Sequence, residues 1–226
     1  MATLGIKRAW VARVDQNFKV ITGVNGINGQ ASDTDGRFLI DESSSQGVAS
    51  ANMTNLQGAL SDIYGSNKLV YKSAAKGNAQ TVLTVNHLPA DVKQRMLGAV
   101  DDGRGGYSIN GKANSNNRIA LLVESSDAFD ITQPVYFGFY AGIVTEASEN
   151  VATNDASEKR TQDALTFGHL ERGDDGFGKR YFSWLSNFDK TKMMNDIFPS
   201  ASGTSAYSNT STSTASTTAS TTTASN

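Results

Sequence analysis

The sequence predicts a mainly β domain with one or two short flanking helices. Six Asn-Gly or Asp-Gly pairs are spread along the chain, and these residues tolerate the positive φ that tight hairpin turns require. The stretch from Pro134 to Trp184 holds an apolar run at 135–144, a long polar segment, and two further short strand patterns. Pairs of strand patterns joined by turn residues are typical of an antiparallel sheet.

Strand patterns recur through the body of the chain. We predict strands at Ala9–Val14, Phe18–Thr22, Arg37–Asp41, Lys68–Ser73, Ala79–Asn86, Arg118–Glu124, Val135–Thr145, Ala164–Glu171 and Lys179–Trp184. Successive side chains of a strand point to opposite faces. In the apolar run we therefore expect Val135, Phe137, Phe139, Ala141 and Ile143 to face the core.

Two segments have helical spacing. In Leu88–Gly98 the apolar residues Leu88, Val92 and Met96 recur every four positions, which predicts one buried stripe. Gly98 suits a left-handed helix cap. A second helix is expected over Trp184–Ile197.

Composition divides the chain into two parts. Eighteen of the 27 residues from Ser200 to Asn226 are Ser or Thr, and such a segment has little apolar surface to offset its ordering entropy. We expect 1–199 to form one β domain and 200–226 to be a disordered tail. The body is long enough to bury a core without disulfides.

Charge and residue types exclude several classes of protein. There is no cysteine, which excludes disulfides and thiolate catalysis. The net charge of −2 gives no basic field for binding duplex DNA. No apolar run is long enough to cross a bilayer, and the N-terminus lacks the apolar block of a signal peptide. We expect synthesis in a cytoplasm and no membrane partner.

No motif predicts catalysis, a metal or a cofactor. Asp33, Asp35 and Glu42 have the spacing of calcium ligands around Gly36, but Ala31 stands at the first ligand position. A plain Asp-Gly turn is the favoured interpretation. Without cysteine, a zinc site would need both histidines, His87 and His169, and a carboxylate. Ordinary hydrogen-bonded or surface roles are the favoured interpretation.

Two long polar stretches are candidate contact arms, Glu42–Asn67 and Glu146–Gln162. Long connections in compact domains are usually functional or disordered. The second stretch is a solvated loop or an arm whose mixed charges set register against a neighbouring subunit. The candidate subunit-contact residues are Glu146, Glu149, Asp155, Glu158, Lys159 and Arg160.

Three stretches in order resemble the major tail proteins of long-tailed bacteriophages that infect Gram-positive bacteria. These stretches begin with Leu4–Lys7 leading into a strand, continue with the strand and helix at 81–99, and end with the block from Val135 to Trp184. The resemblance covers residues 1–190. The Ser/Thr-rich tail departs from the pattern of that family.

The resemblance implies a β-sandwich or half-barrel without an active site. Six subunits would join sheet edges to close a ring, and rings would stack through long arms to form the tail tube of a virion. The partners implied are further copies of the chain, a tape-measure protein, and tail terminator and tip proteins, with DNA only in transit. The alternative is a cell-surface or carbohydrate-binding β-sandwich with a Ser/Thr-rich stalk.

Overall fold

A computed structural model describes residues 2–109, 111–151, 153 and 161–200. These residues form eleven strands, three α-helices and two single 3-10 turns, η1 (Gly23–Asn25) and η2 (Gly173–Asp175). The fold is mainly β, as predicted, and its sheets are antiparallel. In chain order the strands and helices are β1 (Thr3–Val14), β2 (Arg37–Ile40), α1 (Glu42–Ser45), β3 (Val48–Thr54), β4 (Leu60–Gly65), β5 (Lys68–Ala74), β6 (Gln80–Val85), α2 (Ala90–Leu97), β7 (Arg118–Asp127), β8 (Pro134–Phe139), β9 (Gly142–Thr145), β10 (Asp163–His169), β11 (Gly178–Phe182) and α3 (Lys190–Ile197).

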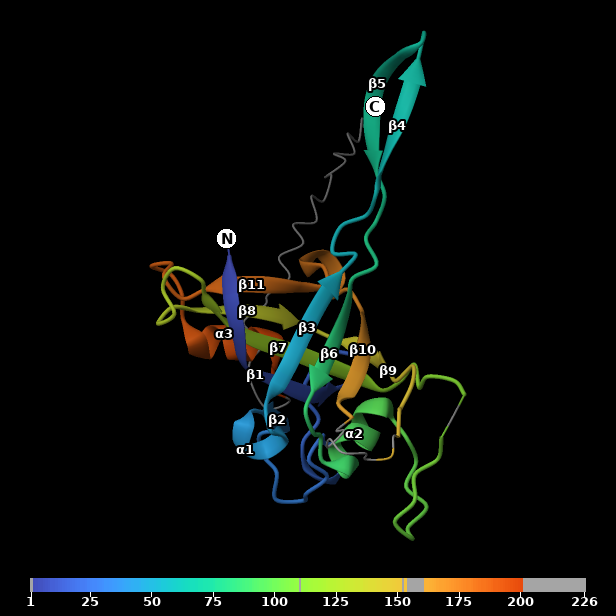
Figure 1. Cartoon of the computed structure of the whole chain (residues 1–226), viewed down its shortest axis with the longest axis vertical. Helices are drawn as coiled ribbons and strands as arrows, with labels where there is room; N and C mark the ends of the chain where they lie inside the picture. Colours follow the sequence, from blue (N-terminus) through green and yellow to red (C-terminus); the bar gives the residue numbers. More distant parts are fainter. Residues whose placement is uncertain (1, 110, 152, 154–160, 201–226) are drawn as a thin grey trace, which may run out of the picture.

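The main sheet divides into two halves at β7 (Figure 1). One half has the order β2-β1-β7-β8-β11, and the other has the order β9-β10-β6-β3. The chain passes from one half to the other at Tyr140 and Ala141, between β8 and β9. Within the described residues β2, β3 and β11 each pair with one strand only, so each leaves one edge unpaired.

Two apolar cores hold this arrangement together. The first lies between the two halves of the sheet and includes Phe139 and Phe167, together with the α2 stripe of Leu88, Val92 and Met96. The burial of this stripe confirms the prediction. The second core lies where α3 covers the opposite face of β1, β7 and β8, and it includes Tyr140 and other buried side chains.

Glycine at position 138 lets α3 approach the sheet closely. A Cβ atom at Gly138 would lie 2.5 Å from Cδ1 of Ile197, well inside van der Waals contact. Burial of the side chains of β8 is therefore not confined to the face that was predicted to point inward. Tyr136 and Tyr140, on the opposite face, are also buried because α3 lies over them.

Several predicted boundaries are wrong. Val135–Thr145 is two strands and not one, and the alternation shifts at the break, so that Val144 lies in the first core and Ala141 in the second. Phe18–Thr22 is not a strand. Phe18 has a φ of 62°, and Asp15 Oδ1 accepts hydrogen bonds from the backbone N–H groups of Asn17 and Lys19, which turns the chain.

Two further predictions need correction. The helix predicted over Trp184–Ile197 begins only at Lys190, because the Asp189 side chain caps it by accepting from the N–H groups of Thr191 and Lys192. The stretch Glu42–Asn67 is not a polar connection, since it contains α1, β3 and β4. The predicted tail, apart from Ser200, lies outside the described residues.

Candidate assembly surfaces

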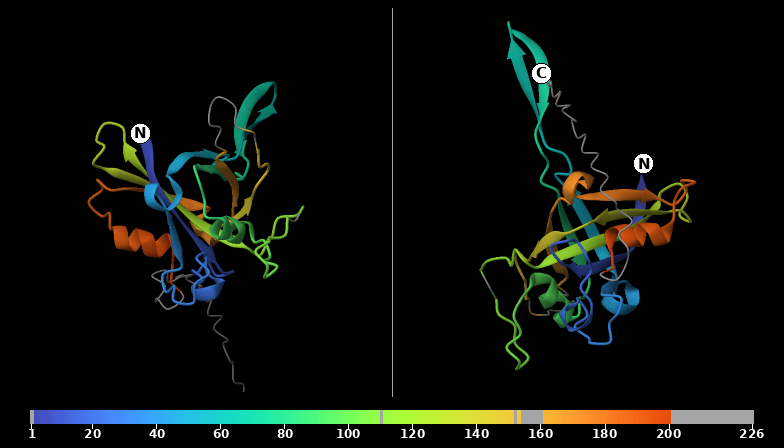
Figure 2. Two further views of the ribbon diagram at one scale, coloured as in Figure 1. Left: turned by 60° about the horizontal axis from the view of Figure 1, so that its bottom comes forward. Right: turned by 180° about the vertical axis from the view of Figure 1, so that it is seen from behind.

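The β4–β5 hairpin projects away from the body of the molecule in every view (Figures 1 and 2). Ser66 and Asn67 both have positive φ, 49° and 61°, as a two-residue type I′ turn requires. The strands pair with Ile63 opposite Tyr71, and Lys72 forms an ion pair with Asp62. The hairpin is thus well formed by local rules.

Exposed apolar side chains cover this hairpin. Tyr64 is 68% exposed and Val70 is 63% exposed. The other exposed apolar residues of the hairpin are Leu60, Ile63, Leu69 and Tyr71. An isolated two-stranded hairpin is marginally stable in water, and a contiguous exposed apolar patch usually marks a contact surface. The β4–β5 hairpin is therefore the strongest candidate for binding a second molecule.

A tight neck joins the hairpin to the body. The Ala75 N–H donates to the Ala59 carbonyl at 3.0 Å. A Cβ atom at Gly58 would lie 2.0 Å from the Ala75 oxygen, so only glycine permits this approach. Lys76 forms an ion pair with Glu171, which follows β10. These contacts hold together the two segments at the base of the hairpin and connect them to the main sheet.

The first residue of the predicted arm at 146–162 contacts a buried lysine of α2. Lys93 of α2 has a side chain 8% exposed, and its Nζ lies 2.8 Å from Asp163 and 2.9 Å from Glu146. Glu149 lies 3.4 Å away. Burial alone would lower the pKa of Lys93, but hydrogen bonds to Asp163 and Glu146 outweigh it and raise the pKa above its usual value.

These contacts place two of the six predicted contact residues. Glu146 and Glu149 lie against α2 through Lys93. The other four, Asp155, Glu158, Lys159 and Arg160, lie outside the described residues. Asp163 also accepts a hydrogen bond from the Leu88 N–H at 2.9 Å. Both ends of the segment are therefore fixed at the start of α2.

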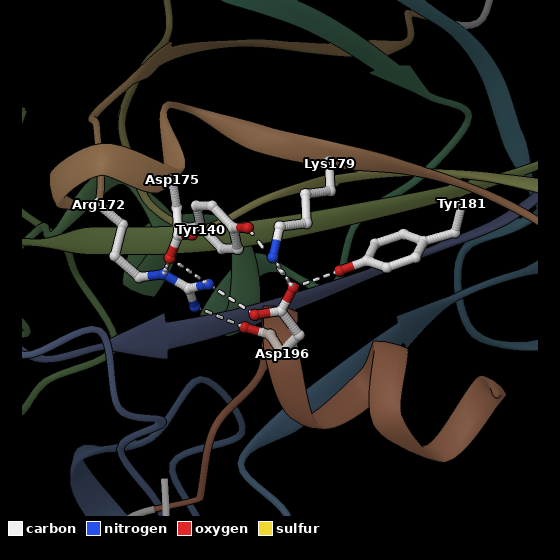
Figure 3. A network of polar contacts seen from close by, with 6 residues as sticks. All are labelled: Tyr140, Arg172, Asp175, Lys179, Tyr181 and Asp196. Carbon is white, nitrogen blue, oxygen red and sulfur yellow. Dashed lines mark hydrogen bonds and ion pairs between the residues drawn. The ribbon is translucent and has the colours of Figure 1, made fainter. Parts of the chain in front are cut away.

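A second buried polar network fastens α3 to the sheet (Figure 3). Asp196, with a side chain 10% exposed, accepts from Arg172 Nη2 at 2.6 Å and from Lys179 Nζ at 3.1 Å. The Tyr181 hydroxyl donates to the same carboxylate. The Arg172 guanidinium also lies 3.5 Å from the centre of the Tyr140 ring.

The charges of this network are matched by their partners. Burial alone would raise the pKa of Asp196, but hydrogen bonds from Tyr181, Arg172 and Lys179 lower it below its usual value. Burial, with the neighbouring Asp196 charge, raises the pKa of Tyr140 to about 12. Asp196 is thus a carboxylate and Tyr140 a neutral phenol at neutral pH, which gives the network a structural role.

Among the described residues, no group of three or more His, Cys, Asp or Glu side chains is placed to hold a metal ion. Asp33 accepts from the N–H groups of Asp35 and Gly36, which is the predicted Asp-Gly turn. His87 is exposed and His169 is buried and hydrogen-bonded. Separately, none of the described helices has both the length and the apolar character to cross a membrane.

We expect His169 to make the fold sensitive to acid. Its ring stacks on Phe139 with centroids 3.8 Å apart, and Nε2 lies 2.8 Å from the Thr81 hydroxyl. Burial lowers the pKa of His169 to about 4. In the unfolded chain the His169 imidazole becomes protonated near pH 6.5, whereas in the native chain it stays neutral at that pH. The free energy of unfolding should therefore fall by about 1 kcal/mol per pH unit below pH 6.5.

Urea unfolding at pH 7, 6 and 5 measures this slope. The matched variant is His169→Leu, which should show little change over the same range, because carboxylates affect stability mainly below pH 5. Parallel slopes for the two proteins would contradict the assignment to His169.

Sequence reasoning placed β4 in the candidate arm Glu42–Asn67 and β5 in a separate predicted strand, and it missed that the two form one hairpin. The signal was present in the turn pair Ser66-Asn67 with Ile63-Tyr64 before it and Leu69-Val70-Tyr71 after it. Aromatic and β-branched residues on both sides of a two-residue turn are typical of a hairpin.

The described part of the chain is a mainly β domain with unpaired sheet edges and a projecting apolar hairpin, features typical of a structural subunit. A family model described as phage tail tube protein matches residues 1–206. The chain therefore belongs to the phage tail tube protein family, which is structural and not enzymatic, and it is a component of the virion. A search of curated proteins found no match to this chain.

Proposed function

We propose that the chain forms rings of six subunits that stack into the tail tube, through which DNA passes when the phage ejects its genome. The family supports the tail-tube role. The unpaired edges of β2, β3 and β11 support closure of a ring by strand addition, since edge pairing satisfies exposed backbone groups and a closed ring removes the free edges.

The observation that carries the stacking proposal is the exposed apolar hairpin. The β4–β5 hairpin extends from one end of the molecule, and α1 and α2 lie toward the other end (Figure 1). Such an arrangement supports a contact between the hairpin of one ring and the α1–α2 end of a subunit in the next. Burial of side chains such as Tyr64 and Val70 would supply the apolar contact.

The segment 146–162 is proposed as a second contact arm. Glu146 at its start and Asp163 just after its end both contact Lys93 of α2, on the end of the molecule proposed to receive the hairpin. In this proposal Glu146, Glu149, Asp155, Glu158, Lys159 and Arg160 set register by charge.

The remaining partners follow from the same proposal. A tape-measure protein would occupy the lumen before DNA, and terminator and tip proteins would close the two ends of the tube. A net charge of −2 supports passage of DNA, because a wall without a basic field does not retain phosphates. Residues 1–199 would form the tube, and 200–226 a disordered fringe.

Negative-stain microscopy and sedimentation of the purified protein test the proposal. We expect rings or hollow tubes, and a folded monomer without tubes when 147–161 is deleted. A wild-type protein that stays monomeric at high concentration contradicts the tail-tube proposal, whereas normal tubes from the deletion contradict only the assignment of this arm.

A further inference from the structure

The loop between β7 and β8 presents two apolar side chains on a fixed backbone. Phe129 is 92% exposed and Ile131 is 61% exposed. Asp127 Oδ1 accepts from the Phe129 N–H at 2.8 Å, and Asp130 Oδ1 accepts from the Thr132 N–H at 3.0 Å. The two aspartates thus hold the backbone while both apolar side chains point to solvent.

A fixed loop with an outward aromatic side chain is suited to binding. Because the backbone of the loop is already ordered, binding a partner costs little further conformational entropy. Buried aromatic side chains also dominate the binding energy of many interfaces. The loop also lies beside the start of β1, where Thr3 pairs with Asp127 and the exposed Leu4 pairs with Ser126. Three exposed apolar side chains, Leu4, Phe129 and Ile131, therefore lie at this end of the half-sheet.

A groove with complementary properties lies between β11 and α3. Its volume is about 630 Å³, and the chain around Phe18 forms one wall. Apolar side chains contribute much of its lining: Phe18, Phe182, Leu185, Phe188 and Met193. A groove of this size is within the range that binds a compact apolar group.

The loop and the groove carry opposite charge. The groove lining includes five cationic and two acidic residues, a net charge of +3. Asp175, which pairs with Arg172 at the edge of this lining, reduces the local net charge to +2. Residues 127–133 contain two acidic residues and no basic one, a net charge of −2. Lys7 of β1 donates a hydrogen bond to the Ile131 carbonyl at 3.3 Å, so the net charge at the loop is −1. Complementary charge favours encounter and fixes register between such surfaces.

We propose that the β7–β8 loop of one subunit inserts Phe129 and Ile131 into the α3 groove of a second copy. The contact rests on the proposed function, for which it supplies a lateral joint between subunits. The loop lies at the end of the strands and the groove lies on the face covered by α3. A joint between two different surfaces is head-to-tail, and its repetition gives a ring or a helical array.

Disulfide cross-linking between two single-cysteine variants tests the contact. The chain has no cysteine, so Ile131→Cys and Leu185→Cys can be prepared separately, with a tag on one of them to mark the mixed product. Assembly of the mixture under oxidising conditions should give a tagged–untagged covalent dimer in at least tenfold excess over the control mixture. The matched control pairs Ile131→Cys with Tyr71→Cys, which is also exposed but lies on the hairpin.

A second measurement uses the exposed side chains directly. The double variant Phe129→Ser/Ile131→Ser should unfold like the wild type, because both side chains are exposed, and should need at least tenfold more protein to assemble. Val100→Ser, which alters another exposed apolar residue, should assemble normally. Tubes that form without the mixed cross-link overturn this contact and leave the tail-tube proposal standing, whereas failure of the wild type to assemble overturns both.

Discussion

Replacing the β4–β5 hairpin with a short turn should abolish tube formation and leave a folded monomer. The Ala75 N–H already bonds the Ala59 carbonyl at 3.0 Å, so residues 60–74 can be exchanged for Asn-Gly, which closes two paired strands. None of the removed residues belongs to either apolar core. Circular dichroism and thermal unfolding should therefore match the wild type, while electron micrographs show no tubes.

A milder change tests whether assembly needs the apolar side chains of the hairpin or only the presence of the hairpin. Tyr64→Thr/Val70→Thr keeps residues that favour strands and removes two of the six exposed apolar side chains of the hairpin. It should raise the protein concentration needed for assembly at least tenfold. The matched control is Ser61→Thr/Ser73→Thr, a directly opposed pair on the same hairpin, which should assemble normally. Tubes from the hairpin replacement would refute the role of the hairpin in stacking.

The Asp196→Ala variant should lose about 3 kcal/mol of unfolding free energy, because it leaves Arg172 and Lys179 without the carboxylate that balances them. The side chain of Arg172 is 16% exposed, so water replaces the lost partner poorly. Loss of the network should also loosen α3, whose Ile197 lies in the second core. Urea unfolding followed by circular dichroism measures the change.

Asp175→Ala is the matched control for this network. Asp175 also pairs with Arg172, at 3.1 Å, but its side chain is 29% exposed, and exposed ion pairs contribute little. We expect a loss below about 1 kcal/mol. Equal losses from the two variants would contradict the larger contribution assigned to Asp196.

Sequence patterns predicted the parts of the fold in which side chains alternate strongly. The strand that became β6 and the stripe of Leu88, Val92 and Met96 were found because burial and periodicity agree there. β3 was missed because it is an edge strand with mostly polar, partly exposed residues, and its pairing with β6 determines its conformation. The break at Tyr140 was missed because both faces of this strand are buried, one of them under α3.

The candidate site could be predicted only in part for similar reasons. Glu146 and Glu149 were recognised as members of a charged arm, but their pairing with Lys93 joins residues more than fifty positions apart, and sequence spacing does not reveal such contacts. The Asp196 network likewise joins α3 to residues that precede it by up to 56 positions. Local rules do suffice for the hairpin turn at Ser66 and Asn67.

The order in which parts of the molecule can form has a consequence for handling the protein. The hairpin needs only neighbouring residues, and such turns close within microseconds. The main sheet needs β1 to meet β7, whose residues Val11 and Leu121 are 110 positions apart, and long-range pairing of this kind is slow. The hairpin can therefore form transiently, with its apolar side chains exposed, before the body has folded. Refolding by rapid dilution to low concentration should yield more soluble protein than slow dialysis of a concentrated sample.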